Sequence, residues 1–390
     1  MIVEGLKKFE EYGAVKIYEV IRVLELDSSS THNIRGVFEL DYNTITELAY
    51  KTAIVVPIKD DELFSFEGVL SAIPHESPII VVSASSREPV DRFRHEVEVA
   101  RLLHNKTKKS IIVVHQHDPA WAEALQDTRV SEVLGRDGKV RSGKGEGMLL
   151  GVLLAAGLGA EYVGFVDSDC YVPGAVHEYV WSYYAGFALA SSPYVMVRIK
   201  WPYKGKIAGI QQDIYFRKRG RVSMHTNNVL NMVLSLARGV ETDIIVTANS
   251  GEHALSTKLA MSMGWAGGFA VEPYELVYLL ERCWLGLDKG QCPLLPYDAK
   301  IIQIETRNPH IHAERGDEHI MDMLSLSLGT VYHSKLADGR IKSAIMDILR
   351  SYGVEGEPPA PRLYPSLAGV DAQRVMASFF STSDEAVILE

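Results

Sequence analysis

The segment Tyr162-Val-Gly-Phe-Val-Asp167-Ser-Asp169 joins a short apolar run to two carboxylates. Alternate side chains of an extended chain point the same way, so Asp167 and Asp169 share one side. Paired carboxylate oxygens suit Mg²⁺ or Mn²⁺. An Asp-x-Asp pair also occurs in turns and on solvated surfaces. The apolar strand before this pair favours the metal site over that structural alternative.

Three more β-branched runs occur earlier in the chain: Ala53-Ile-Val-Val-Pro57, Pro78-Ile-Ile-Val-Val-Ser83 and Ser110-Ile-Ile-Val-Val-His115. Continuous apolar runs are typical of parallel strands that are covered on both faces. Helical patterns over 89–103 and 147–158 alternate with them. The pattern predicts an α/β fold, Rossmann-like, with a largely parallel sheet.

Ligands of such sheets bind beyond the carboxyl ends of the strands. We therefore expect a site where four residues follow their strands: Pro57, Ser83, Gln116 and Asp167. The second half of the chain is more mixed. Its predicted strands are 196–201 and 301–306, and its predicted helices are 226–236 and 253–262.

Four regions are expected along the chain. They are a preamble packed on the core (1–50), a nucleotide-sugar-binding domain (51–200), an acceptor-side region (201–345), and a proline-containing linker with a C-terminal segment (346–390). We draw no sharp boundary between the two central regions.

The composition argues against several classes of protein. The 390 residues carry a net charge of −10 without a block of Lys and Arg, which argues against nucleic acid as a partner. The most apolar stretch, 148–160, is shorter than the ~20 residues needed to span a bilayer. The cysteines Cys170, Cys283 and Cys292 are too few and too scattered for a disulfide framework and lack zinc-site spacing. A reducing cytoplasm is the expected setting.

Arg141-Ser-Gly-Lys-Gly-Glu-Gly147 precedes a predicted helix. Glycines allow close backbone approach and helix N-termini favour anions, so Lys144 could meet a phosphate. The spacing is wrong for a Walker A loop. A solvated turn is the alternative.

Three further segments leave their roles open. Gly220-Arg-Val-Ser223 is either an oxyanion clamp or a surface turn. In Gly251-Glu252-His253, which opens a predicted helix, Glu252 either favours the helix dipole or holds sugar hydroxyls. In Asn308-Pro-His310-Ile-His312, proline stops a strand and exposes two histidines, which could ligate a metal or catalyse.

Together these segments resemble the mannosyl-3-phosphoglycerate synthases. The resemblance runs from about residue 10 to about residue 340. It is carried by 53–57, 141–148 and 162–169, and by Pro173-Gly-Ala-Val176, Gly220-Arg-Val-Ser223, Gly251-Glu-His-Ala254 and Gln303-Ile-Glu-Thr-Arg-Asn-Pro-His-Ile-His312.

The resemblance implies a GT-A fold that transfers mannose from GDP-mannose to the 2-hydroxyl of 3-phosphoglycerate with retention. It also implies a divalent cation, Mg²⁺ or else Mn²⁺ or Co²⁺. By likeness, the metal ligands are Asp169, His310 and Asp167, and the catalytic residues are Asp167, Asp169 and Glu252. The nucleotide-sugar residues are Pro57, Asp61, Ser83, Gln116, Lys144 and Asp167, and the acceptor residues are Arg141, Arg221, Ser223 and His312.

The chain departs from the family at two places. Asp167-Ser-Asp-Cys170 stands where the family often has Asp-Ala-Asp-Asn, and Asp60-Asp61 where it often has Asn-Glu, which leaves the nucleotide preference open. The nearest rival is a glucosyl-3-phosphoglycerate synthase. A sugar-phosphate nucleotidyltransferase is disfavoured by the acidic 57–62 loop. A non-catalytic nucleotide-sugar sensor is the third alternative. A homodimer is a possible assembly.

Overall fold

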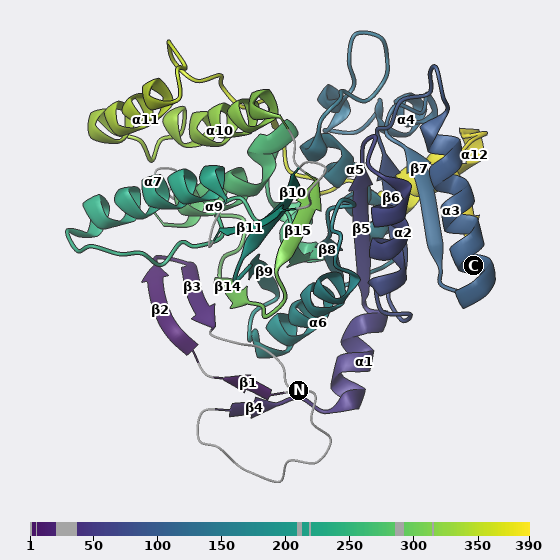
Figure 1. The fold of residues 1–390 in the computed structure, drawn as a ribbon, viewed down its shortest axis with the longest axis horizontal. Coiled ribbons are helices and arrows are strands. Elements are labelled where there is room, and N and C mark those ends of the chain that lie inside the picture. Colours follow the sequence, from purple (N-terminus) through teal and green to yellow (C-terminus); the bar gives the residue numbers. More distant parts are fainter. Residues whose placement is uncertain are drawn as a thin grey trace.

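The computed structural model describes residues 2–4, 6–20, 37–208, 213–217, 220–284, 292–313 and 316–390. Within these ranges ten strands form one sheet (Figure 1), in the order β17-β7-β6-β5-β8-β12-β9-β14-β3-β2. Only β17, β12 and β2 run antiparallel to their neighbours. The strands are β2 (Leu6–Tyr12), β3 (Val15–Val20), β5 (Thr52–Ile58), β6 (Ile79–Ser83), β7 (Ile111–His115), β8 (Tyr162–Phe165), β9 (Tyr194–Lys200), β12 (His253–Ser256), β14 (Ala299–Glu305) and β17 (Val387–Leu389).

The four predicted apolar strands are confirmed as β5, β6, β7 and β8, which lie together and parallel in the sheet. Their composition follows from burial on both faces. On β5, Ala53 and Val55 pack into the core on one side, whereas Ile54 and Val56 pack into the core on the other. All four side chains are fully buried, so no polar position alternates with the apolar ones.

Helices cover both faces of this sheet (Figure 1). One core contains residues of α4 (Ala120–Leu125), α5 (Lys144–Gly157), α7 (Arg221–Arg238), α9 (Val271–Cys283), α10 (Asp317–Tyr332), α11 (Gly339–Ser351) and α12 (Ala372–Thr382). The other contains residues of α1 (Tyr42–Tyr50), α2 (Leu63–Ala72), α3 (Arg92–Thr107) and α6 (Pro173–Leu189). The predicted helices over 89–103, 147–158 and 226–236 correspond to α3, α5 and α7.

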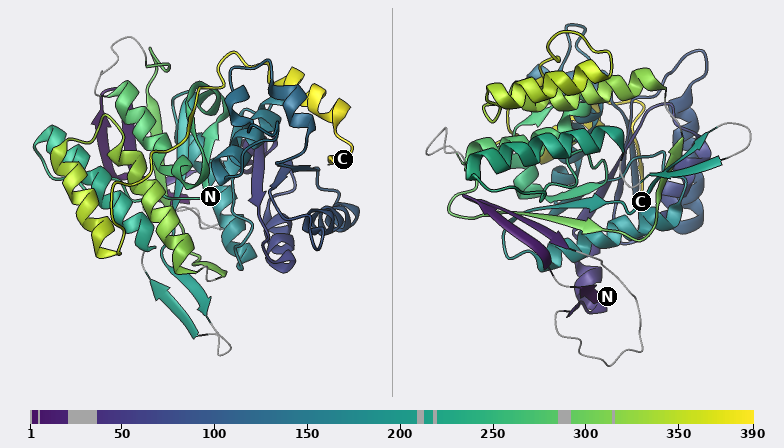
Figure 2. Two further views of the ribbon diagram at one scale, coloured as in Figure 1. Left: turned by 90° about the horizontal axis from the view of Figure 1, so that it is seen from above. Right: turned by 60° about the vertical axis from the view of Figure 1, so that its left-hand side comes forward.

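A second sheet has the order β11-β10-β15, with β10 (Lys204–Ala208), β11 (Asp213–Arg217) and β15 (His310–Ala313). The left view of Figure 2 shows the β10–β11 hairpin projecting beyond the helices. Strand β15 runs parallel to β10 and pairs His310 with Lys204. This pairing places β15, which carries His310 and His312, at the base of the hairpin. Two short pairs complete the sheets: β1 (Ile2–Glu4) with β4 (Val37–Glu39), and β13 (Trp265–Ala266) with β16 (Leu363–Tyr364).

One predicted local structure is wrong, and one of two open alternatives is excluded. Residues 253–262 are not one helix: His253–Ser256 is β12, which lies between β8 and β9, and only Thr257–Ser262 is helical, as α8. Ala254 and Leu255 pack into opposite cores, as they must in a central strand. Gly220-Arg-Val-Ser223 is not a surface turn. Gly220 is the N-cap of α7, and the helix begins at Arg221.

The C-terminal segment belongs to the body of the protein. Helix α12 packs against α4 and α5, where Phe379 stacks on Trp121 with ring centroids 3.8 Å apart. Strand β17 extends the sheet beside β7, and Arg87 makes two hydrogen bonds to Glu385. At the other end of the chain, β2 and β3 form the opposite edge of the sheet. The four-part division of the chain stays a prediction.

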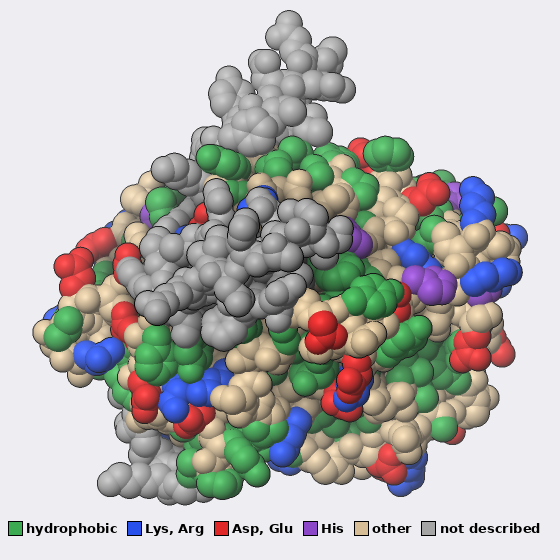
Figure 3. Space-filling view, turned by 90° about the horizontal axis from the view of Figure 1, so that it is seen from below, with side chains coloured by type: hydrophobic (Ala, Val, Ile, Leu, Met, Phe, Trp, Pro, Cys, Tyr) green, Lys and Arg blue, Asp and Glu red, His purple; other side chains and the backbone are tan. Residues whose placement is uncertain are grey.

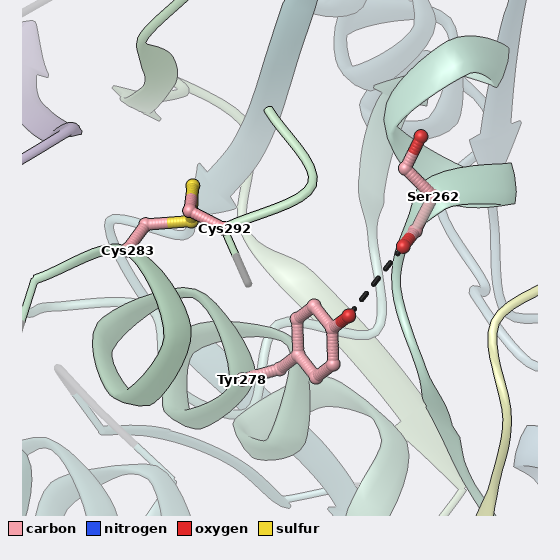
Figure 4. Close-up of a disulfide and its surroundings, with 4 residues drawn as sticks. All are labelled: Ser262, Tyr278, Cys283 and Cys292. Carbon is pink, nitrogen blue, oxygen red and sulfur yellow. Dashed lines mark hydrogen bonds between the residues drawn. A yellow bond between two sulfur atoms is a disulfide. The ribbon is translucent and has the colours of Figure 1, made fainter. Parts of the chain in front are cut away.

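The cysteines form no disulfide framework in the described residues, but two of the three are paired. Cys283, at the end of α9, forms a disulfide with Cys292, near Tyr278 and Ser262 (Figure 4). Their separation of nine residues gives no sequence signal, because the pairing depends on the path of the chain between them. Cys170 is free and buried. This disulfide weakens the inference of a reducing setting that was drawn from the cysteine content.

In the described part of the chain, no helix combines the length and apolar character needed to cross a membrane. On the face seen in Figure 3, Lys and Arg side chains are interspersed with Asp and Glu. They do not gather into one broad basic patch on that face.

Candidate active site

A cavity of about 600 Å³ opens at the carboxyl ends of β5, β6, β7 and β8. Ten predicted site residues line it: Pro57, Asp61, Gln116, Lys144, Asp167, Asp169, Arg221, Ser223, His310 and His312. Three others do not line it. Ser83 and Glu252 are buried beneath it, and Arg141 turns away to the carbonyl of Glu132.

Lys144 joins two carboxylates at the floor of the cavity. It is the first residue of α5, and its Nζ lies 2.6 Å from Asp167 Oδ1 and 2.8 Å from Glu272 Oε1. Burial alone lowers the pKa of Lys144, but the carboxylates of Asp167 and Glu272 outweigh it and raise that pKa above its usual value. The ammonium therefore stays charged at the floor of the cavity.

Glycines keep this ion pair close to the backbone. A Cβ atom on Gly251 would lie 2.4 Å from Asp167 Oδ2 and 2.9 Å from Lys144 Nζ. Gly143, the N-cap of α5, has a φ of 157°, and a Cβ atom there would lie 2.1 Å from Glu146 Oε2. Neither position has room for a larger residue, which explains the glycines flanking these charged groups.

Gln116 and Asp61 hold the neighbouring loops. The Gln116 amide nitrogen donates to the carbonyls of Arg141 (2.7 Å) and Gly143 (3.1 Å), so it fixes the turn before α5. Asp61 accepts a hydrogen bond from the hydroxyl of Ser168. The loop from β5 is thereby tied to the Asp167–Asp169 segment.

Both histidines of β15 are buried, which corrects the prediction that proline leaves them exposed at a strand end. The His310 ring stacks on Trp201 with centroids 4.6 Å apart. His312 Nδ1 lies 3.9 Å from Asp169 Oδ2. Burial lowers the pKa of His310 well below its usual value, and Lys204 acts in the same direction. The neutral imidazole is the form that binds metals.

The donor types suit a divalent cation, because carboxylate and imidazole side chains are among those that line the cavity. The described residues nevertheless contain no preassembled group of three or more His, Cys, Asp or Glu side chains that could hold a metal. Asp167 is instead paired with Lys144, and His310 faces Glu252. That Asp169, His310 and Asp167 are metal ligands stays a prediction.

Glu252 lies behind the cavity wall. It is fully buried, neither carboxylate oxygen has a hydrogen-bond partner, and Oε1 is 3.8 Å from His310 Nδ1. Burial, reinforced by nearby Asp167, raises the pKa of Glu252 well above that of an ordinary carboxyl. The prediction that Glu252 grips sugar hydroxyls stays a prediction, since Gly251 rather than Glu252 lines the cavity.

The start of α7 forms the basic side of the cavity. Residues 220–223 line it, and the first turn contains no acidic residue and no side-chain cap. The N-terminus of a long helix attracts anions. Among the described residues, the ion pair of Arg221 is a loose surface contact, 3.6 Å from the highly exposed Asp317. Lys204 lies over Trp201, with Nζ 4.8 Å from the ring centroid.

Several cavity residues escaped sequence reasoning, among them Trp201, Lys204, Asn249, Phe269, Glu272 and His319. Glu272 stands in the first turn of α9, and Lys204 begins a short strand. Neither belongs to a motif with a chemical signature. Only the three-dimensional arrangement reveals these residues as part of the site, because each belongs to an element other than the four predicted apolar strands.

A buried ion network supports the loop that carries Gly251. Arg198, fully buried on β9, donates to the carbonyls of Thr247 (3.1 Å), Ala248 (3.2 Å) and Glu272 (3.1 Å), and to the Glu275 carboxylate. The other oxygen of Glu275 lies 3.0 Å from His253 Nε2.

Arg198→Met is expected to lower the free energy of unfolding by about 3–5 kcal/mol, because Glu275 would keep a buried charge without its main partner. Urea denaturation followed by circular dichroism measures this. The matched control is Arg340→Ala, which removes an exposed pair with Asp338 and should change stability far less. If both substitutions lower the free energy of unfolding equally, the buried network contributes no more to stability than an exposed ion pair does.

Comparison with known proteins identifies the family of this chain. A model of the family described as mannosyl-3-phosphoglycerate synthase matches residues 6–379. The mannosyl-3-phosphoglycerate synthase of Aeropyrum pernix is 53% identical over 378 residues, which cover 97% of each protein. That of Pyrococcus furiosus is 44% identical over 382 residues, or 96% of each protein. A crystal structure of a mycobacterial protein matches with a TM-score of 0.51 at 18% identity, covering 87% of this chain and 95% of that one.

The mostly parallel sheet and the site at its carboxyl edge, read with these relatives, define an enzyme of the GT-A glycosyltransferase class. The predicted fold class is thereby confirmed. Within that class, the chain belongs to the mannosyl-3-phosphoglycerate synthase family.

Proposed function

We propose that the chain transfers mannose from GDP-mannose to the 2-hydroxyl of 3-phosphoglycerate with retention, releasing GDP and mannosyl-3-phosphoglycerate. The observation that carries the proposal is a single cavity with two separate groups of anion-binding residues. Lys144 lies at the carboxyl edge of the sheet, and the α7 N-terminus with Arg221 forms another wall. Two anionic substrates could thus meet in one site. The family membership supports the same pairing.

On the donor side, Pro57, Asp61 and Gln116 line the part of the cavity formed by β5 and β7. Asp167 and Lys144 lie beside them. As GDP departs, negative charge accumulates on its diphosphate. The Lys144 ammonium, at the start of α5, would offset that charge.

Asp169, His310 and Asp167 would hold a divalent cation, with Mg²⁺, Mn²⁺ and Co²⁺ as candidates. When bound, such a cation would act as a Lewis acid on the leaving diphosphate. The chain's net charge of −10 makes this local positive charge necessary for binding two anions.

On the acceptor side, Arg221, Ser223 and the first N–H groups of α7 would bind the phosphate, with His312 nearby. A guanidinium can make two parallel hydrogen bonds to a phosphate, which fixes the orientation of the acceptor as well as its position. The reacting hydroxyl would then lie between this end and Asp169.

For retention, we favour attack from the same face as the departing diphosphate, with a leaving phosphate oxygen accepting the proton of the hydroxyl. The alternative is a covalent glycosyl-carboxylate intermediate. Glu252, the candidate nucleophile, is fully buried and does not line the cavity. That placement argues against the covalent route.

A donor-by-acceptor matrix tests the proposal. GDP-mannose, GDP-glucose, UDP-glucose and UDP-mannose are each combined with 3-phosphoglycerate, 2-phosphoglycerate and glycerate. GDP-mannose with 3-phosphoglycerate is expected to give the highest kcat/KM. A preference for a glucose donor would favour the glucosyl rival instead, and binding without turnover would favour a nucleotide-sugar sensor. Release of pyrophosphate from a nucleoside triphosphate and a sugar phosphate would indicate a nucleotidyltransferase.

A further inference from the structure

Glu146 is a fully buried carboxylate two residues after Lys144 in the first turn of α5. Its Oε1 accepts hydrogen bonds from Arg362 (2.9 Å) and from the hydroxyl of Tyr364 (2.7 Å). Its Oε2 accepts from the backbone N–H of Gly268 (2.8 Å). Glu146 does not line the cavity, so a direct contact with substrate is not its role.

Two of these partners come from the proline-containing stretch near the C-terminus. Strand β16 pairs antiparallel with β13, so that Tyr364 lies opposite Trp265. The backbone N–H of Gly267 also donates to the carbonyl of Arg362 at 2.8 Å. The C-terminal segment is thus fixed beside the loop 266–269.

That loop and the turn before α5 are in close contact around the carboxylate. A Cβ atom on Gly145 would lie 2.0 Å from the carbonyl oxygen of Ala266, and one on Gly267 would lie 2.3 Å from Glu146 Oε1. Residues from both sides of this contact line the cavity: Ser142, Gly143 and Lys144 from one side, and Gly268 and Phe269 from the other. A shift of the carboxylate would therefore move both walls.

We infer that Glu146, held by Arg362 and Tyr364, is a positioning residue for the donor nucleotide. It locks the Lys144 turn against the 266–269 loop, so the C-terminal segment forms part of the donor site although it does not touch the ligand. The inference rests on the proposed function, in which Lys144 meets the diphosphate. A buried carboxylate that loses its cationic partner must shift or take up water, and we expect a shift of Glu146 to move Lys144, two residues away in the same helical turn.

Arg362→Ala tests this, since the Arg362 side chain is half exposed and its removal leaves no cavity in the core. Calorimetric titration with GDP at fixed Mg²⁺ is expected to show about tenfold weaker binding. The KM for GDP-mannose should rise in parallel, while the KM for 3-phosphoglycerate stays unchanged. Arg362→Lys should recover part of the loss, because it restores the charge without the planar fork. Tyr364→Phe should give a smaller loss of the same kind.

Arg87→Ala is the matched control. It breaks the other Arg–Glu tether of the C-terminal segment, to Glu385, without touching α5. If both alanine variants lower the melting temperature and have the same affinity for GDP, the Glu146 contacts only stabilise the fold. The inference is then overturned. If the parent protein transfers no mannose but Arg362→Ala still weakens GDP binding selectively, the proposed function fails while the positioning role stands.

Discussion

Asp169→Ala is expected to lower kcat by at least about 100-fold while the protein remains folded. The carboxylate stands at the carboxyl edge of the sheet near His312, where it would hold the cation that offsets charge on the leaving diphosphate. Loss of one electrostatic stabiliser of a transition state typically costs about 10²–10³ in kcat. Steady-state kinetics measures the loss, and Mn²⁺ titration followed by electron paramagnetic resonance measures cation affinity independently.

Chelation provides the second arm of this prediction. Excess EDTA should abolish transfer, and Mg²⁺, Mn²⁺ or Co²⁺ should restore it. Mn²⁺ or Co²⁺ should be more effective than Mg²⁺, because His310 is a softer ligand than Mg²⁺ prefers. Asp347→Ala, which removes a carboxylate exposed on α11, is the control and should keep full activity. Full activity of the parent protein in excess chelator would refute the metal assignment.

Arg221→Ala is expected to raise the KM for 3-phosphoglycerate by about 10- to 150-fold and to leave the KM for GDP-mannose nearly unchanged. The range corresponds to a charge-assisted contact of about 1.5–3 kcal/mol. Arg221 opens α7 and faces the cavity, and its contact with exposed Asp317 is too loose to compete with a phosphate. Arg221→Lys should recover only part of the affinity.

Glycerate separates a phosphate contact from a structural role. Glycerate should be a poor acceptor for the parent enzyme. Its KM should hardly change in the Arg221→Ala variant, because glycerate has no phosphate for Arg221 to contact. If the substitution impairs both acceptors equally, or chiefly weakens GDP-mannose, Arg221 is structural or belongs to the donor side.

The sequence predicted the strands of the sheet best where both faces are buried. In the runs at 53–57, 79–82 and 111–114, every position is apolar because helices cover both sides. The same rule failed at 253–256. That strand is only four residues long and runs directly into α8, so its pattern could not be separated from the helix that follows.

The candidate site was predictable where a motif ends a strand or begins a helix. Asp167 and Lys144 meet because β8 and α5 deliver them to the same edge. Side-chain direction could not be predicted. Glu252 points behind the wall, and Arg141 turns outward. Both depend on packing against elements that are distant in sequence.

Contacts with the C-terminal segment had no sequence signal. Four prolines between 355 and 365 are typical of a linker, and a linker is what we predicted there. The chain instead forms β16 and supplies two hydrogen bonds to Glu146. Pairing over more than 200 residues is set by the tertiary fold and leaves no local pattern.

The central claim is transfer of mannose, with retention, to the 2-hydroxyl of 3-phosphoglycerate. The most direct test is NMR of the product formed from GDP-mannose labelled with ¹³C at the anomeric carbon. The account predicts one product, with a correlation from the labelled carbon to C2 of phosphoglycerate and the one-bond carbon–proton coupling of an α-mannoside. A β-mannoside, a linkage to another atom, or free mannose as the only labelled product would contradict it.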